Sequence, residues 1–232
     1  MTTTTTSKTI TLSKNTLSIL KNFASMNSNI LIKPGNDIKT ITPSKNAMAE
    51  SKVEETFDIE FGIWDLNKFL GVISLFSSPS LEFDTKFVTI SGSNGSSVKY
   101  YYSEPRLLTT PTKQVNMPKS VASISLSDKT FNELQKASSV LQLPDIQFVG
   151  SGKKIIATVL DLGDPTTNSY KIEVGDNKTG AEFRFNFKME NIRLLPGNYD
   201  VEFAKNVVGQ FTHETLDLTY WFAMENTSTY SA

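Results

Sequence analysis

The sequence predicts an α+β protein built from two copies of one unit of roughly 110 residues. Residues 12–32, LSKNTLSILKNFASMNSNILI, read as an amphipathic helix running into a strand, and short apolar segments separated by turns follow. The same order restarts after residue 120, beyond a proline-containing stretch. We therefore expect a flexible tail at 1–11, domains at 12–104 and 121–225, a connector at 105–120 and a C-terminal tail at 226–232.

Composition narrows the classes of protein. The 232 residues are 38% hydrophobic, enough for one large core or two ordinary ones. Cysteine is absent, which excludes disulfides, thiolate nucleophiles and zinc–cysteine sites. No apolar run approaches the roughly 20 residues that cross a bilayer, and MTTTTTSKTI lacks the apolar core of a secretion signal. We expect a cytoplasmic protein whose net charge of −1 allows nucleic-acid contact only through uneven charge placement.

The first predicted helix has an apolar face and an opposite face of lysines and serines without acidic residues. Ser13 can cap its first turn. The core-facing positions at helical spacing are Leu17, Leu20, Phe23, Ala24 and Asn27. The outward stripe, with no carboxylate, is Lys14, Ser18, Lys21, Ser25 and Ser28. Such a stripe favours a negatively charged partner, although an ordinary solvated face would have a similar pattern.

The remainder of the first unit alternates strands with one more helix. Phe57 to Phe61 alternates apolar and acidic residues, as a half-buried strand does. Residues 63–73 return to helical spacing with Lys68 outward. Three strands, LEFD, KFVTIS and VKYYYSE, then lead to the connector, whose spaced prolines favour an extended chain.

The second unit repeats this plan. Leu126-Ser127 matches Leu12-Ser13, and FRFNFKMENIRLL echoes FDIEFGIWDLNKFL, predicting a strand followed by a short helix. YDVEFAK and LTYWFAME then match SLEFDTK and VKYYYSE. Four elements match in order, which is the sequence signature of an internal duplication.

Catalytic groups do not converge in this sequence. His213 alternates with Phe211 as a strand residue, and Gly150-Ser151-Gly152-Lys153 lacks the phosphate-loop frame and reads as a hairpin turn. Asp161 and Asp164 are typical turn formers. We therefore predict a binding or structural protein with no catalytic residues, metal or cofactor, the alternative being an enzyme that assembles a site from scattered acids.

Three strings, LSKNTLSILKNFASMNSNILIK, FGIWDLNKFLGVISLF and MENIRLLPGNYDVEFAK, closely resemble the sliding clamp of T4-type bacteriophages, the processivity factor of their DNA polymerase. The resemblance runs from about Leu12 to Met224 and implies the DNA-clamp fold, in which helices line a ring and antiparallel sheets form its outside. It implies a homotrimer around duplex DNA in an infected bacterial cell, with the DNA polymerase and an ATP-dependent clamp loader as partners. The family also acts in late transcription.

Charge placement agrees with that resemblance. Four predicted helical segments together have a net charge of +3, which leaves −4 for the rest of the chain. The seven basic residues counted are Lys14, Lys21, Lys68, Lys129, Lys136, Lys188 and Arg193, and the four acidic residues are Asp65, Asp128, Glu133 and Glu190. The residues expected to face DNA are Lys14, Ser18, Lys21, Lys68, Lys129, Lys136 and Arg193. Asp128 and Glu133 reduce the positive charge of the predicted helix in the second unit. A virion protein of repeated α+β domains is the alternative, which lysine stripes on helices disfavour.

The resemblance also implies a pocket for a hydrophobic peptide of the polymerase or loader. Its expected residues lie in the connector and the last strand: Val115, Met117, Pro118, Trp221 and Ala223. Trp221 and Ala223 would share one strand face, as a pocket wall requires. The alternative is that Trp221 is an ordinary core aromatic residue.

Overall fold

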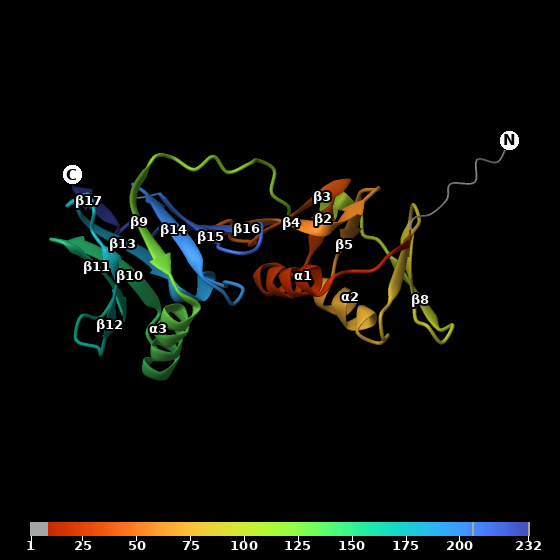
Figure 1. Ribbon diagram of the computed structural model, residues 1–232, viewed down its shortest axis with the longest axis horizontal. Coiled ribbons are helices and arrows are strands. Elements are labelled where there is room, and N and C mark those ends of the chain that lie inside the picture. Colours follow the sequence, from red (N-terminus) through yellow and green to blue (C-terminus); the bar gives the residue numbers. More distant parts are fainter. Residues whose placement is uncertain (1–8, 206, 232) are drawn as a thin grey trace. The chain divides into compact units, whose positions relative to one another are not determined.

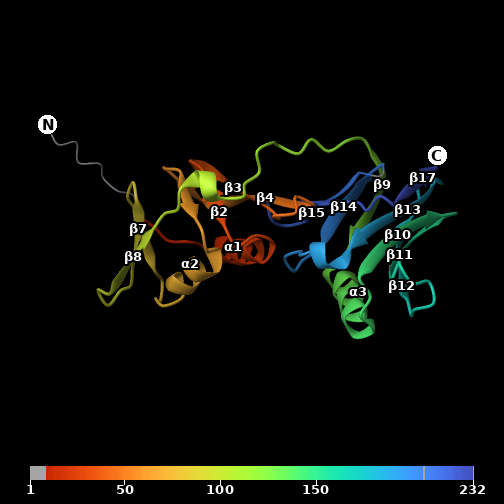
Figure 2. The ribbon, with the colours of Figure 1, turned by 180° about the vertical axis from the view of Figure 1, so that it is seen from behind.

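The computed structural model describes residues 9–205 and 207–231, which form two compact units (Figures 1 and 2). The first unit contains the chain up to Pro43 and Glu50–Thr112, and the second contains Ser44–Ala49 and the chain from Lys113. The expected connector is thus divided between the units after Thr112.

The first unit opens with a short strand, a helix and a meander. Its elements are β1 (Thr9–Ile10), α1 (Lys14–Met26), β2 (Ile30–Ile32), β3 (Gly35–Ile41), β4 (Ala47–Phe57, begun in the second unit), β5 (Phe61–Ile63), α2 (Leu66–Ile73), β6 (Ser80–Phe83), β7 (Phe87–Ser91), β8 (Ser97–Tyr101) and the 3₁₀ helix η1 (Pro105–Leu107). One sheet has the order β1-β6-β7-β8, and β2 pairs with β5. The side chains of Leu20, Phe23, Ile63 and Phe69 are buried in its core.

The second unit repeats this order. Its elements are β9 (Ser120–Leu126), α3 (Asp128–Leu141), β10 (Asp145–Ser151), β11 (Lys154–Leu160), β12 (Tyr170–Asp176), β13 (Glu182–Lys188), the 3₁₀ helix η2 (Met189–Asn191), β14 (Tyr199–Ala204), β15 (Val208–His213), β16 (Leu218–Ala223) and β17 (Thr229–Ser231). Its five-stranded sheet runs β12-β11-β10-β13-β17, and its other strands pair in the order β16-β15-β14-β9. The core of the second unit contains the fully buried rings of Phe148, Phe185, Phe203 and Phe211.

Strand pairing confirms the duplication. In the first unit β1 pairs with β6 and β2 with β5, and in the second β9 pairs with β14 and β10 with β13. The chain also continues beyond the equivalent strands β8 and β16 in a similar way. The Ser103 amide donates to the Gly62 carbonyl after β8, and the Glu225 amide donates to the Asn186 carbonyl after β16.

Three predicted segments differ in the structure. The expected strand over Phe57–Phe61 is interrupted at residues 58–60, because β4 ends at Phe57 and β5 starts at Phe61. In the predicted N-terminal tail, residues 1–8 lie outside the described residues, but Thr9–Ile10 form β1 on β6. In the predicted C-terminal tail, Thr229–Ser231 form β17 on β13.

The predicted fourth helix is wrong, because only the single turn of η2 occupies its place. Aligning Phe187 with Phe61 puts Pro196 where α2 has Leu70. Proline lacks the amide hydrogen that a helix interior needs, and its ring clashes with the carbonyl four residues earlier. Consequently Lys188 ends β13 and Arg193 lies beyond η2, so neither is on a helix.

Candidate nucleic-acid and partner-binding surfaces

Helix α1 presents the predicted two faces. The Ser13 hydroxyl accepts a hydrogen bond from the Thr16 amide at 3.1 Å, which caps the first turn. The buried side is as expected at Leu20, Phe23, Ala24 and Asn27, with Leu17 half-buried. The stripe of Lys14, Ser18, Lys21 and Ser25 is exposed, whereas Ser28, also exposed, lies beyond the end of the helix.

A buried carboxylate in β4 fixes the start of α1. Glu55 accepts hydrogen bonds from the Ser13 amide and from the Thr16 hydroxyl, the latter at 2.5 Å. A negative charge at a helix N-terminus also interacts favourably with the helix dipole. Sequence reasoning missed this residue, although Glu55 shares strand parity with buried Val53 and Phe57, and a carboxylate on an apolar face signals such a role.

Two asparagines fix the other end of α1. The Asn27 side-chain amide donates to the carbonyls of Ile41 (2.9 Å) and Thr109 (3.0 Å). The Asn29 side-chain oxygen accepts from the Thr109 amide at 3.0 Å. The exposed stripe therefore sits on a helix held at both ends by polar contacts within the first unit.

Helix α2 adds one more exposed lysine. The Asp65 carboxylate accepts from the Lys68 backbone amide at 2.9 Å and caps the helix, while the Lys68 side chain is exposed. Helix α2 packs against α1. The two helices together carry Lys14, Lys21 and Lys68 and no carboxylate within their bounds.

Helix α3 is electrically balanced. Ser127 caps it through the Thr130 amide at 3.1 Å, and Lys129 and Lys136 are exposed. The same helix contains Asp128 and Glu133. The net positive charge expected of the helices is thus concentrated in the first unit.

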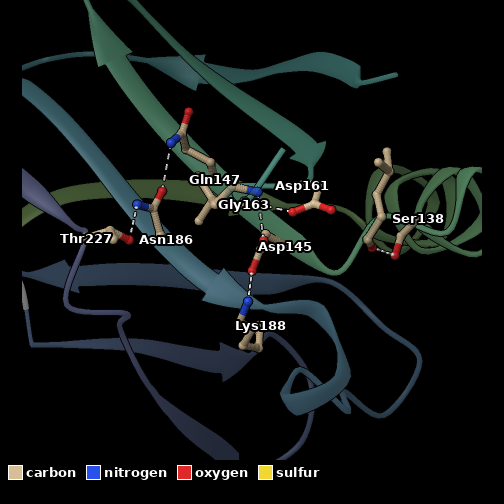
Figure 3. A network of polar contacts seen from close by, with 10 residues as sticks. Ser138, Asp145, Gln147, Asp161, Gly163, Asn186, Lys188 and Thr227 are labelled. Carbon is tan, nitrogen blue, oxygen red and sulfur yellow. Dashed lines mark hydrogen bonds and ion pairs between the residues drawn. The ribbon is translucent and has the colours of Figure 1, made fainter. Parts of the chain in front are cut away.

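Lys188 does not contribute an available charge. Its ammonium lies 2.6 Å from Oδ1 of Asp145, a carboxylate that is only 1% exposed (Figure 3). Oδ2 of Asp145 accepts from the Leu162 amide at 3.0 Å. Because the hydrogen bond to Asp145 stabilises the charged ammonium, the pKa of Lys188 is raised. The pair neutralises itself, which corrects the basic count made from sequence.

Arg193 is exposed just beyond η2. Its Nε donates to the Glu190 carbonyl at 3.1 Å. The guanidinium is therefore positioned by the turn that replaces a fourth helix.

The expected pocket residues belong to the second unit. Val115 and Met117 are half-buried, and Pro118 and Ala223 are exposed. Trp221 alternates with Tyr220 and Phe222, whose rings stack at 5.9 Å in the core, so the indole lies on the opposite sheet face. It is nevertheless 7% exposed, and its Nε1 donates to Oε1 of Gln210 at 2.9 Å. This polar partner on β15 was not predicted.

A second unpredicted network holds the C-terminal segment. The Gln147 amide donates to the Asn186 side-chain oxygen at 2.8 Å, and Asn186 donates to the Thr227 hydroxyl at 2.9 Å (Figure 3). The chain before β17 is thereby attached to β13 by side chains as well as by strand pairing.

The residues that sequence reasoning excluded from catalysis have structural roles. Nδ1 of buried His213 accepts from the amides of Thr215 (3.1 Å) and Leu216 (3.2 Å). Gly150 and Ser151 end β10, and Gly152 and Lys153 form the β10–β11 hairpin turn. Asp161 and Asp164 accept amides two residues ahead, as turn formers do, and the bonds from Thr166 lower the pKa of Asp164.

Neither a metal site nor a membrane-spanning helix is found within residues 9–205 and 207–231. No group of three or more histidine or acidic side chains there could hold a metal ion. None of the helices there is long and apolar enough to cross a membrane.

A duplicated unit with helices on antiparallel sheets defines the DNA-clamp class, and solved structures share this fold. An Archaeoglobus fulgidus PCNA bound to the C-terminal region of FEN-1 matches with a TM-score of 0.69 at 14% identity, covering 94% of this chain and 97% of that chain. A Helicobacter pylori beta clamp bound to a DNA ligase peptide matches with a TM-score of 0.70 at 12% identity, covering 94% of this chain and 65% of that chain.

Comparison of sequences identifies the family within this fold class. The family model for the DNA polymerase processivity factor matches residues 13–105, and that for the C-terminal part of the gp45 sliding clamp matches residues 124–226. The sliding clamp of Enterobacteria phage T4 is 30% identical, with 94% of this chain and 98% of the relative covered. That of Vibrio phage KVP40 is 29% identical, with 92% and 98% covered. The chain belongs to the phage sliding-clamp family of DNA polymerase processivity factors.

Proposed function

We propose that three copies of this chain close into a ring around duplex DNA and tether the viral DNA polymerase in the cytoplasm of an infected bacterium. The candidate residues for DNA contact are Lys14, Ser18, Lys21, Lys68, Lys129, Lys136 and Arg193. Such contacts read phosphates and not bases, so topology and weak electrostatics would retain the DNA. An ATP-dependent loader would open the ring, because a closed ring cannot thread onto circular DNA.

The order of strands supports the ring and indicates its joint. In the second unit the Ala223 amide donates to the Asn46 carbonyl at 2.8 Å, where β16 meets the start of β4. The repeat equivalents of β16 and β4 are β8 and β12, and each ends its sheet among the described residues. Pairing β8 of one copy with β12 of the next would reproduce the β16–β4 neighbours and satisfy both edges.

Solution mass tests the joint. We expect a trimer by light scattering that persists on dilution. Tyr101 of β8 is 68% exposed, and Tyr101→Asp should shift the particle toward monomers because it places a charge at the joint. The matched control is Leu107→Asp, at a residue that is 58% exposed and outside β8, which should leave the trimer intact.

Retention on DNA tests the function itself. Protein loaded by the loader and ATP onto nicked circular DNA should stay bound and should leave when the circle is cut. A monomer at all concentrations, together with equal retention on circular and linear DNA, would contradict the ring.

We further propose that the chain binds a peptide segment of the polymerase or the loader. The A. fulgidus PCNA and the H. pylori beta clamp are both described with bound segments of partner proteins. We place the corresponding site at Val115, Met117, Pro118, Trp221 and Ala223. The supporting observation is that Trp221 lies on the sheet face opposite the aromatic core, where its indole donates a hydrogen bond to Gln210.

A further inference from the structure

Helices α1 and α3 can be superposed by their caps. Ser13 and Ser127 each accept the amide three residues ahead, so Lys14 and Asp128 are equivalent first residues. The α1 stripe of Lys14, Ser18, Lys21 and Ser25 therefore corresponds in α3 to Asp128, Asn132, Gln135 and Ser139. The stripe that carries two lysines in the first unit carries none in the second.

The two lysines of α3 point in another direction. Lys129 and Lys136 are equivalent to Asn15 and Asn22, one residue further along, which is about 100° around the helix. In α1 the side-chain amide of Asn15 donates to the carboxylate of Glu54 in β4 at 3.2 Å. Side chains at this position therefore point toward a neighbouring strand and not along the lysine stripe. Asp128 is also held in place, because its oxygens accept from the Gly197 amide and the Asn132 side chain, each at 2.9 Å.

The segment beside α3 adds no net positive charge to the groove next to this helix. The equivalent of Lys68 is Leu194, because α2 has no helical counterpart. A groove of about 490 Å³ lies between α3 and η2, and its polar lining includes Gln135, Ser138 and Ser139. The one lysine that lines it, Lys188, is paired with Asp145, and Glu190 is also present.

We propose that, among the candidate residues, Lys14, Lys21 and Lys68 of the first unit make the phosphate contacts, and that the α3 face, where Asp128 and Glu133 balance Lys129 and Lys136, is a spacer without net positive charge. This inference rests on the proposed function. A ring of three copies then contacts duplex DNA at three basic patches and not at six. Each patch is separated from the next by a polar, recessed surface, which keeps the total number of phosphate contacts low and favours sliding.

The chain supplies a matched pair of variants. Lys14→Ala/Lys21→Ala and Lys129→Ala/Lys136→Ala each remove two exposed lysines seven residues apart on one helix. Binding of the full-length protein to a short fluorescent duplex is measured across a series of salt concentrations. We expect the α1 pair to weaken binding about tenfold and to reduce the salt slope by at least about one, and the α3 pair to change binding less than about twofold.

A gain of binding gives an independent test. Gln135 is exposed at the position equivalent to Lys21, so Gln135→Lys should tighten binding several-fold. Equal losses from the two lysine pairs, a larger loss from the α3 pair, or no gain from Gln135→Lys would overturn the inference. None of these outcomes affects retention of the wild type on circular DNA, whose failure would instead contradict the proposed function.

Discussion

The position of the α1 lysines, which we propose contact DNA, depends on the buried carboxylate of Glu55. Glu55 is 9% exposed, and its carboxylate bonds to the backbone of Ser13 and the hydroxyl of Thr16. A buried carboxylate is tolerated only where hydrogen bonds replace its hydration. Here the donors belong to the first turn of α1, so the charge on β4 and the start of the helix stabilise each other.

We predict that Glu55→Ala lowers the free energy of unfolding by about 1–3 kcal/mol, because it leaves the Ser13 and Thr16 donors without their acceptor. The neighbouring Glu54, exposed and bonded only to the Asn15 side chain in the described contacts, is the control. Glu54→Ala should change the free energy by less than about 0.5 kcal/mol. Thermal unfolding at one fixed protein concentration measures both, and equal effects would contradict the anchoring role.

At the scale of elements, the second unit departs from the first where the chain after β13 cannot form a helix. Loop residues 194–198 instead hold the start of α3. Tyr199 donates to the Leu195 carbonyl at 2.5 Å, and Tyr220 accepts from the Leu195 amide at 3.2 Å. Burial raises the pKa of both tyrosines, since it disfavours the phenolate.

Two equivalent glycines should respond oppositely to alanine. Gly71 lies inside α2 with nothing within 4 Å of an added Cβ, so Gly71→Ala should stabilise by about 0.5–1 kcal/mol. Gly197 has φ +152°, and a Cβ there would lie 2.2 Å from Nε2 of His213. Gly197→Ala should therefore destabilise by about 2 kcal/mol or more.

Denaturant unfolding of the two glycine variants checks this prediction. Gly180→Ala serves as the strain control, because Gly180 has φ +69° but no neighbour within 4 Å. Its cost should fall below that of Gly197→Ala. A stabilising Gly197→Ala would mean that the loop moves freely away from His213.

The spacing of apolar residues predicted most of these elements, because that spacing reflects which face of each helix or strand is buried. The duplication, the three α-helices and the faces of α1 followed from apolar spacing and cap residues such as Ser13 and Ser127. The fourth helix was wrong because similarity to α2 outweighed the proline at 196. Strands β1 and β17 were missed because Thr9–Ile10 and Thr229–Ser231 depend on pairing with β6 and β13, which short segments do not encode.

The candidate surfaces were only partly predictable. Exposure of Lys14 and Lys21 follows from helical spacing alone. Two contacts could not be predicted from a local pattern, because each joins residues that are distant in the chain. They are the ion pair between Lys188 and Asp145 and the hydrogen bond from Trp221 to Gln210. Charge counted along a sequence therefore overestimates the charge that a folded surface presents.

At the scale of the whole molecule, a clamp must separate its DNA-contacting surface from its partner-binding surface. In the second unit Trp221 and Ala223 share the sheet face opposite Tyr220 and Phe222, so changes there leave the aromatic core in place. The two residues differ in exposure, which makes Ala223 the better probe of binding. Replacing nearly buried Trp221 also removes packing, whereas Ala223 is already exposed.

We predict that Ala223→Asp abolishes most polymerase stimulation, because a carboxylate would be buried unpaired when an apolar peptide docks. The trimer mass and retention on circular DNA should be unchanged. Thr219→Asp on the same strand face, half-buried in the structure, is the positional control and should keep stimulation. Primer extension on a circular template measures the effect; full stimulation by Ala223→Asp would move the partner site away from β16, while loss by both variants would extend it along the strand.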